Sequence, residues 1–519
     1  MSILLFVADQ LRPEHLGFAG DLPVRTPHID SIAARGRVFD QALVANPVCM
    51  PNRATIMTGR WPSAHGLRTN GIPLDPTART FARTLRSQGW QSSAVGKLHF
   101  QPMGWPYEEW QLEEIRSTMP ALYEAAISGP FGEDFVSWED YQRHLDGDVR
   151  LPDDYYGFDD VALTTGHGDR VSGNYVAWAR ARGHDPLTMA GPEVSARRYP
   201  GWNSQVYESA VPSALHPTTY VAEEAIGRLR RFAQRPEPWI LLVSFPDPHH
   251  PFAPPHEYWT RHQASDMPLP STFTDPHETS PEHIRRVTAR RGVPDADSTM
   301  TWAPTADQFR HALAAELGAV EFIDDSVGRV LAELSDLGIE DETTVAFTSD
   351  HGDLFGDHGL MLKHFTHYRS VLRVPLVIAH PGVTPGRSSA LVSSADIAPT
   401  LLDLADAPAL PAAQGRSLVS LMRGDESGWR TGLLVEEDQP FGIDGLAGPV
   451  RLRTVVTDSF RLTEILGRDA TELYDLDTDP QELVNLAGQG TDLEATAFRV
   501  MAQELMRVDD DSVVPIDGA

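Results

Sequence analysis

The chain has 519 residues, 41% of them hydrophobic, and a formal net charge of −30. This length supports a large core, while the negative charge argues against the phosphate backbone of a nucleic acid as the main ligand. No run approaches the ~20 apolar residues of a membrane-spanning helix, and the N-terminus lacks a basic leader and a cleavage site. We therefore expect no membrane partner, and a cytoplasmic protein if Met1 is the natural start.

Short apolar runs, taken in chain order, predict the buried strands of a sheet. They cover residues 3–8, 92–95, 239–245 and 344–349. Segments between and after these runs predict helices, at residues 28–36, 78–88, 218–233, 308–337 and 395–406. Strands that alternate with helices indicate an α/β fold, here a large, mainly parallel sheet flanked by helices.

Two stretches interrupt this alternation and one new pattern follows it. Residues 102–215 and 254–306 have little periodicity and are rich in Pro and other loop formers, so we interpret them as largely loop insertions, the first covering a sheet edge. After a stretch with Pro and Gly near residues 410–430, short strands and a final helix are predicted. We expect a catalytic α/β domain at 1–425 and a smaller C-terminal α+β subdomain at 426–519.

Each predicted strand leads into polar side chains that are able to do chemistry. The four runs end, in order, at Asp9 and Gln10, at Lys97 and His99, at His249 and His250, and at Asp350 and His351. In open α/β sheets, ligands bind beyond the carboxyl ends of the strands. Four such strand ends indicate one shared site, although any one of them alone would be weak evidence.

The acidic strand ends favour a metal site. Asp9 and Asp350 can place two carboxylates on one cation, with Gln10 and His351 beside them. Oxygen ligands suit Ca²⁺ or Mg²⁺, whereas an imidazole and the lack of a third carboxylate favour Mn²⁺. The alternative for each acid alone is a helix cap or a solvated side chain.

Basic residues near the strand ends favour an anionic substrate. Arg53, Lys97 and Lys363 can neutralise a tetrahedral oxyanion, and His99 or His249 can donate a proton to a leaving oxygen. A single Lys or His is more often a surface group, so this interpretation depends on the set.

Cys49 is the only cysteine, which excludes an internal disulfide and a zinc site of paired thiolates. Pro51 and Arg53 follow it in a Cys-x-Pro-x-Arg pattern, ahead of a predicted helix that ends near Thr58. A cysteine just before a helix N-terminus, with a guanidinium four residues on, is in a setting that favours anions. The alternative is an ordinary buried core residue.

Five motifs occur in a fixed order between residue 3 and about residue 486. They are Cys49-x-Pro51-x-Arg53 with Thr58-Gly59-Arg60, Gly96-Lys97-x-His99, Pro248-His249-His250-Pro251-Phe252, Asp350-His351-Gly352 with Lys363, and Glu472-Leu473-Tyr474-Asp475-Leu476. This combination resembles the type I sulfatases of the alkaline phosphatase superfamily, and the match is highly specific.

The resemblance implies a reaction and its cofactors. A formylglycine-generating enzyme would oxidise Cys49 to formylglycine, whose hydrated aldehyde attacks the sulfur of a small-molecule sulfate ester; its second hydroxyl then releases sulfate. One divalent metal ion, Ca²⁺ or Mn²⁺, is implied, and so is a homo-oligomer. The implied metal ligands are Asp9, Gln10, Cys49, Asp350 and His351.

The resemblance also implies roles for the remaining site residues. Lys97, His249 and Lys363 would contact the sulfate, and a protonated His would assist the departing alcohol. Arg53 would brace the nucleophile and the metal, and His99 would support the nucleophile. Asn70 matches a position that touches the substrate oxyanion.

Two departures from the family pattern leave alternatives open. Asn52 stands where Ser or Ala is common, and Gln10 replaces the second Asp of an Asp-Asp pair. Gln10 with His351 resembles the branch of promiscuous phosphonate monoester and phosphodiester hydrolases, which usually lacks the Lys97/His99 pair. We expect a sulfatase for an aryl or small-alcohol sulfate, with that branch as the first alternative and a catalytically silent binding protein as the second. Trp105, Tyr107 and Trp110 are candidates for an aromatic wall around the alcohol.

Overall fold

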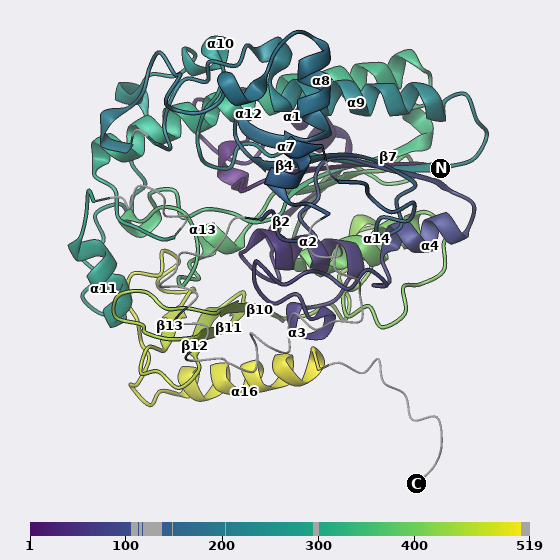
Figure 1. Ribbon diagram of the computed structural model, residues 1–519. Coiled ribbons are helices and arrows are strands. Elements are labelled where there is room, and N and C mark those ends of the chain that lie inside the picture. Colours follow the sequence, from purple (N-terminus) through teal and green to yellow (C-terminus); the bar gives the residue numbers. More distant parts are fainter. Residues whose placement is uncertain are drawn as a thin grey trace.

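The structure is a computed structural model that describes residues 1–104, 113, 117, 138–147, 149–202, 204–293 and 300–509. The three aromatic candidates Trp105, Tyr107 and Trp110 lie outside the described residues. The described chain forms a nine-stranded sheet between two layers of helices and a separate four-stranded sheet near the C-terminus (Figure 1).

The large sheet has the strand order β5-β4-β3-β6-β1-β7-β8-β2-β9. Its five neighbouring strands from β4 to β7 are parallel to one another, while β5 and β8 run antiparallel to their neighbours. The strands are β1 (Ser2–Ala8), β2 (Arg37–Leu43), β3 (Gln91–Lys97), β4 (Asp160–His167), β5 (Arg170–Gly173), β6 (Trp239–Ser244), β7 (Thr343–Ser349), β8 (Leu376–Ala379) and β9 (Gly386–Ser393).

The four strands expected from the sequence are β3, β6, β1 and β7, and they lie side by side in the middle of the sheet. Every residue of β1, β6 and β7 is buried, because helices cover both faces. Alternate residues of β1 belong to two different cores: Ile3 and Leu5 face one, and Leu4 and Phe6 face the other. The prediction of a mainly parallel α/β sheet is confirmed.

Two layers of helices make these cores. The layer with α1, α8, α9 and α12 covers one face, and the layer with α2, α4 and α14 covers the other (Figure 1). The expected helices correspond to α1 (Pro27–Arg35), α4 (Phe81–Ser87), α9 (Pro217–Phe232), α12 (Ala306–Asp336) and α14 (Ile397–Leu404). The longest, α12, begins at a capping box formed by Thr305 and Gln308, which satisfies backbone N–H groups at its N-terminus.

The other helices are shorter or lie at the periphery. They are α2 (Cys49–Thr58), α3 (Pro62–His65), α7 (Tyr141–Asp146), α8 (Asn174–Ala181), α10 (His256–Trp259), α11 (Glu282–Ala289), α13 (Arg369–Leu372), α15 (Val419–Met422) and α16 (Asp492–Arg507). Within the residues that the structure describes, no helix is both long and apolar enough to cross a membrane.

The segment interpreted as a loop-rich insertion, residues 102–215, contributes two strands to the sheet. β4 pairs in parallel with β3, and β5 returns antiparallel to β4 across a tight turn. The middle of β4 is buried on both faces, so its sequence lacks the polar–apolar alternation of a half-buried strand. For this reason local periodicity did not reveal these strands.

The C-terminal sheet is antiparallel and forms a separate subdomain, as expected from the sequence. Its strands are β10 (Gly432–Gln439), β11 (Val450–Thr457), β12 (Phe460–Ile465) and β13 (Glu472–Asp475). Helix α16 covers one face, where its Ala497 and Met501 pack against Val455, Leu462 and Leu473. β10 reaches back to the large sheet: its Glu436 N–H donates to the carbonyl of Ala45 at 2.9 Å.

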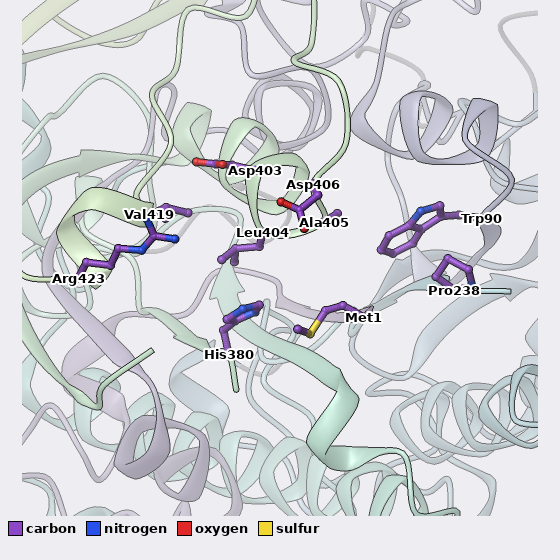
Figure 2. A pocket seen from close by; sticks show the side chains of 10 residues that line it. All are labelled: Met1, Trp90, Pro238, His380, Asp403, Leu404, Ala405, Asp406, Val419 and Arg423. Carbon is purple, nitrogen blue, oxygen red and sulfur yellow. The ribbon is translucent and has the colours of Figure 1, made fainter. Parts of the chain in front are cut away.

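A cavity of about 410 Å³ lies at the amino end of the large sheet (Figure 2). Met1, Trp90 and Pro238, which immediately precede β1, β3 and β6, contribute to its lining together with His380 and Arg423. The chemically capable residues expected from the sequence follow the opposite, carboxyl ends of the same strands. This cavity is therefore separate from the candidate active site.

Candidate active site

The strand ends predicted to form one site do converge. The Asp350 N–H donates to the carbonyl of Ala8 at 3.1 Å, and the Asp9 N–H donates to the carbonyl of Asp247 at 3.1 Å. The ends of β7, β1 and β6 are thereby joined by backbone hydrogen bonds. Gly96 allows the end of β3 to lie close to the end of β6, since a Cβ at this position would lie 1.8 Å from the carbonyl oxygen of Ser244.

Four buried side chains can surround one cation. Ligand atoms of Asp9, Cys49, Asp350 and His351 all lie within 4.8 Å of one another. The distances from His351 Nε2 to the Asp9 and Asp350 carboxylates are 3.6 and 3.7 Å, and Cys49 Sγ lies 3.1 Å from the same nitrogen. Two carboxylates and an imidazole are a donor set that suits a divalent ion.

The imidazole of His351 is prepared for this role. Its Nδ1 lies 2.8 Å from the carbonyl oxygen of Gly352, which fixes the proton on Nδ1 and directs the Nε2 lone pair into the cluster. Burial, together with the nearby Lys363 ammonium, lowers the pKa of His351 to about 4. The ring is therefore neutral at physiological pH, as a metal ligand must be.

Gln10 lies in the same cluster, held in a left-handed backbone conformation with φ +63°. Its backbone N–H donates to Asp350 Oδ1 at 3.0 Å, and its side-chain Nε2 donates to Asp353 Oδ2 at 2.7 Å. The amide oxygen consequently faces inward, where it accepts from Lys363 Nζ at 3.0 Å. The amide is thus oriented for a polar role, and direct metal ligation by Gln10 stays a prediction.

Arg53 links the two carboxylates of the cluster. Its Nε donates to Asp350 Oδ2 at 2.7 Å, and its Nη2 lies 3.4 Å from Asp9 Oδ2. A further nitrogen, Nη1, donates to the carbonyl of Lys97 at 2.6 Å and to Ser244 Oγ at 2.8 Å. Because Cys49 opens α2 and Arg53 follows one turn later, the helix presents both side chains to the same point.

Asn52 also has a local explanation. Its Nδ2 donates to the backbone carbonyl of Asp350 at 2.5 Å, and its Oδ1 accepts from Ser394 Oγ at 2.6 Å and from the Ala45 N–H at 3.1 Å. An Asn at this position ties the helix that carries Cys49 to the strand that carries Asp350.

Two buried lysines lie in the cluster around residue 49: Lys97 ends β3, and Lys363 belongs to the segment between β7 and α13. Lys97 Nζ contacts an Asp9 carboxylate oxygen and lies 2.6 Å from His167 Nε2. Lys363 Nζ lies 3.3 Å from Cys49 Sγ, 3.0 Å from His249 Nε2 and 2.8 Å from His351 Nε2. The sequence-predicted cations and His249 therefore share one cluster with the nucleophile candidate.

The charges of the cluster control the pKa of its groups. Burial favours the neutral form of Asp9, but Lys97 and Arg53 outweigh it and hold the pKa of Asp9 well below its usual value. Burial raises the pKa of the Cys49 thiol, despite the opposing effect of Lys363 and Lys97. An unmodified Cys49 is thus a protonated thiol, which is a poor nucleophile.

His99 and Asn70 lie beside the cluster. The His99 backbone N–H donates to Glu139 Oε2 at 2.7 Å, whereas its buried ring Nδ1 has no hydrogen-bond partner among the described residues. The Asn70 side-chain Oδ1 accepts from the Met50 N–H at 3.2 Å, next to residue 49. Asn70 is therefore placed next to the nucleophile candidate, while the ring of His99 lies 6.4 Å from that of His167.

The sequence analysis missed His167, which ends β4. Its ring nitrogen lies within 4.8 Å of ligand atoms of Cys49 and His249, and its ring stacks on His249 with 3.8 Å between centroids. The signal was present in the chain, because the short apolar run Val161–Leu163 leads through two threonines into Gly166-His167-Gly168-Asp169. It was overlooked because this region was interpreted as loops.

Fold and site together define a hydrolase of the alkaline phosphatase superfamily. The model of the Sulfatase family matches residues 2–407, and that of the N-sulphoglucosamine sulphohydrolase C-terminal region matches residues 356–510. The chain belongs to the sulfatase family.

Named relatives and a solved structure agree with this assignment. The arylsulfatase of Clostridium perfringens is 27% identical over 500 residues, which cover 93% of this chain and 90% of the relative. The choline-sulfatase of Rhizobium meliloti is 26% identical over 509 residues, covering 96% and 86%. The crystal structure of the phosphonate monoester hydrolase of Agrobacterium radiobacter shares the fold, with a TM-score of 0.76, 24% identity and coverage of 99% of this chain and 96% of that one. The protein is thus an enzyme similar to sulfuric ester hydrolases.

Proposed function

We propose that this protein hydrolyses the sulfate monoester of an aryl or small alcohol, with residue 49 acting as the nucleophile after conversion to formylglycine. The observation that carries the proposal is the position of Cys49. Its sulfur lies 3.1 Å from Nε2 of His351, a potential metal ligand, and 3.3 Å from the Lys363 ammonium, with the Asp9 carboxylate close by. Such a position suits a group that must be activated by a metal while it attacks an anion.

The side chains fit the two groups that the resemblance implies. Formylglycine supplies a hydrated aldehyde as nucleophile, and the divalent ion supplies Lewis-acid activation. Asp9, Asp350 and His351 would hold the ion, with Gln10 adjacent. Arg53 fixes the orientation of both carboxylates through its contacts at 2.7 and 3.4 Å.

The remaining residues act on the ester. Lys97 and Lys363 stabilise negative charge on the sulfuryl oxygens in the transition state. His249 Nε2 accepts from Lys363 Nζ at 3.0 Å, which places the ring on the same wall of the site; it assists the leaving alcohol once Nε2 carries a proton. Asn70, next to residue 49, is in position to touch a substrate oxyanion.

The test measures kcat/KM side by side on an aryl sulfate, an aryl phosphonate monoester and a phosphodiester. The enzyme is co-expressed with a formylglycine-generating enzyme, and its intact mass is determined. We expect a mass about 18 Da below that of the unmodified chain and a preference for the sulfate. A preference for phosphonate by orders of magnitude would overturn the proposal.

Cys49→Ala is the matched control for the chemistry. It cannot be converted to formylglycine, so we expect a loss of at least ~10³-fold in kcat. Equal turnover by the variant and the wild type, with the modifying enzyme present, would instead support a binding protein without catalysis.

The second candidate is a promiscuous phosphonate monoester or phosphodiester hydrolase, and Gln10 is the observation that favours it. An amide stands where a third carboxylate would add negative charge, and its oxygen is 3.0 Å from Lys363 Nζ. Phosphonate monoesters and phosphodiesters carry one negative charge, as a sulfate monoester does, so a site with one carboxylate fewer accommodates all three anions. The side-by-side kcat/KM comparison separates the two candidates, because the second predicts a preference for the phosphonate monoester or the phosphodiester.

The choice of ion is tested by removing and restoring it. After treatment with a chelator, we expect activity to be lost and the melting temperature to fall, because bound metal offsets repulsion between Asp9 and Asp350. The Asp–His donor set predicts stronger recovery with Mn²⁺ than with Ca²⁺. A fully active chelated enzyme would contradict a metal-dependent reaction.

A further inference from the structure

His167 occupies a prominent place in the site, although none of the five motifs contains it. It ends β4 and lies beside Lys97, which ends the neighbouring strand β3. Its Nε2 lies 2.6 Å from Lys97 Nζ, and its ring stacks on His249 at an interplanar angle of 22°. One side chain thus contacts two residues that the proposed function assigns to the sulfate group.

The hairpin that carries His167 is firmly held. The turn after it contains Gly168, with φ +56°, and a Cβ there would lie 2.7 Å from the carbonyl oxygen of Pro251, in the loop that bears His249. Only glycine permits this close approach without strain. The β4–β5 turn is therefore packed directly against the His249 loop.

Asp169, the second residue of the turn, fixes the turn through hydrogen bonds to other segments of the chain. Its buried carboxylate accepts from Tyr207 Oη at 2.7 Å, from Ser209 Oγ at 2.7 Å and from the Gly191 N–H at 3.2 Å. Three donors on one buried carboxylate leave little freedom to the residues on either side. The position of His167 is accordingly determined by contacts outside the reaction centre.

The contact between His167 and Lys97 has a direct chemical meaning. An ammonium has three N–H donors and no acceptor. In the described part of the chain, Lys97 Nζ has two acceptors, the Asp9 carboxylate and His167 Nε2. Those two bonds fix the rotation of the ammonium and leave its third N–H for a substrate oxygen.

The ring of His167 is in the protonation state that this arrangement needs. Burial and the adjacent Lys97 ammonium lower the pKa of His167 well below its usual value, so the ring is neutral and Nε2 can accept. An unpartnered buried atom lies near: His99 Nδ1, on a ring whose centroid is 6.4 Å from that of His167, has no partner among the described residues. A buried polar atom of this kind indicates a polar occupant in the space beside these rings.

We propose that His167 is a positioning residue of the reaction, which aims the Lys97 ammonium at the sulfuryl oxygens and supports the ring of His249. This inference rests on the proposed function. His167 adds no charge, which suits a sulfate monoester, since that group carries less negative charge than a phosphoryl dianion. Its role is transmitted chiefly through Lys97.

Two substitutions separate the role of His167 Nε2 as an acceptor for Lys97 from the role of the aromatic ring that stacks on His249. His167→Phe keeps an aromatic face against His249 but removes the acceptor for Lys97, and we expect kcat/KM to fall ~30- to 100-fold. His167→Gln keeps an acceptor and loses the ring, and we expect it to retain at least about a third of wild-type kcat/KM. Melting temperature and formylglycine content show whether each variant is folded and mature.

A double-mutant cycle with Lys97→Met decides whether His167 acts through Lys97. If His167 acts through Lys97, His167→Phe has little further effect in the Lys97→Met background, so the two losses are not additive. Additive losses, or His167→Phe with wild-type activity, would overturn the inference. If His167→Phe does not fold, a low kcat/KM for His167→Gln with normal folding and maturation would overturn it equally.

Failure of the proposed function gives a different result. In that case the wild-type enzyme itself has no preference for sulfate, whatever happens at position 167. The cycle is then measured with the best substrate, where non-additive losses would support the positioning role and additive losses would refute it.

Discussion

Two buried charge clusters in this protein differ in how completely their charges are paired. In the C-terminal subdomain, the fully buried Arg461 is bound by two carboxylates, those of Glu482 and Glu472, and donates to Thr463 Oγ1 at 2.8 Å. The rings of Tyr368 and Tyr474 lie on its guanidinium, 5.2 and 4.6 Å from it. Each of its nitrogens has a partner.

The active-site cluster is paired less completely. Three cations, Arg53, Lys97 and Lys363, face the two carboxylates Asp9 and Asp350. Among the described residues, Lys363 Nζ contacts two imidazoles, an amide oxygen and a thiol, but no carboxylate.

A buried ammonium without a carboxylate costs stability, so such an arrangement persists where function requires it. The comparison teaches that the buried cation of the structural cluster contacts carboxylates, whereas the functional cluster keeps one buried cation, Lys363, that contacts none among the described residues.

The largest expected effect tests the active-site half of this comparison. Lys363→Met removes an ammonium that contacts residue 49, and we expect kcat/KM to fall by ~10²- to 10³-fold. The free energy of unfolding should stay the same or rise, because an incompletely paired buried charge is replaced by an apolar chain. Steady-state kinetics and denaturant titration measure both quantities. A marked loss of stability would show that Lys363 is structurally paired.

The structural cluster should respond in the opposite way. Glu482→Gln removes one of two carboxylates from Arg461 and leaves Glu472 in place, so we expect a loss of ~1.5–3 kcal/mol in the free energy of unfolding. The folded variant should keep nearly wild-type kcat/KM, since Glu482 does not contact the candidate site residues in the described structure. A catalytic defect as large as that of Lys363→Met would invalidate the distinction.

A smaller effect is expected where the two regions meet. Glu437, on β10, accepts from His367 Nε2 at 2.8 Å, from Gln439 Nε2 at 2.9 Å and from the Phe365 N–H at 3.2 Å, and it lies 3.3 Å from His364 Nδ1. It thereby holds the segment after Lys363, where His364 and Phe365 have φ of +87° and +61°. Burial opposes ionisation, but the bonds from His364 and His367 outweigh it and hold the pKa of Glu437 below its usual value.

The pH dependence follows from that direction. A carboxyl with a lowered folded-state pKa contributes stability that is complete above its unfolded pKa, about 4.3, and is lost as pH falls toward the folded pKa. We expect Glu437→Gln to be less stable than the wild type by ~1–3 kcal/mol at neutral pH, with the difference narrowing below about pH 4. A difference that is constant with pH would rule out this ionisation.

The smallest effect is expected for an exposed pair. Arg286 lies against Glu282 and Asp444, and all three side chains are about half exposed. Solvent screens such contacts, so Arg286→Ala should leave the free energy of unfolding nearly unchanged. Denaturant titrations of Arg286→Ala and Glu482→Gln, run in parallel, measure the free energy of unfolding of both variants. The exposed pair then serves as the baseline for the buried clusters. A change of several kcal/mol would show that pairing has the same value at the surface as in the core.

The sequence alone was sufficient for the middle of the sheet and for much of the site. β1 and β6 are long apolar runs, and β3 and β7 contain shorter ones. The residues that follow these strands are neighbours because parallel strands end at one edge. The positions of Asp9, Lys97, His249 and Asp350 could be predicted for this reason. The apolar runs and the polar residues that directly follow them are both local features of the sequence.

Only the tertiary structure revealed the rest, because it depends on contacts between distant segments. β4 and β5 were recognised as strands only through their pairing with β3 and with each other, because the local apolar run Val161–Leu163 is short and lies in a segment rich in loop formers. For this reason the sequence analysis did not assign His167 to the site. The same holds for the amide of Gln10, whose orientation is determined by Asp353 and Lys363, more than 300 residues away. Periodicity predicts which elements form, whereas packing decides which side chains meet.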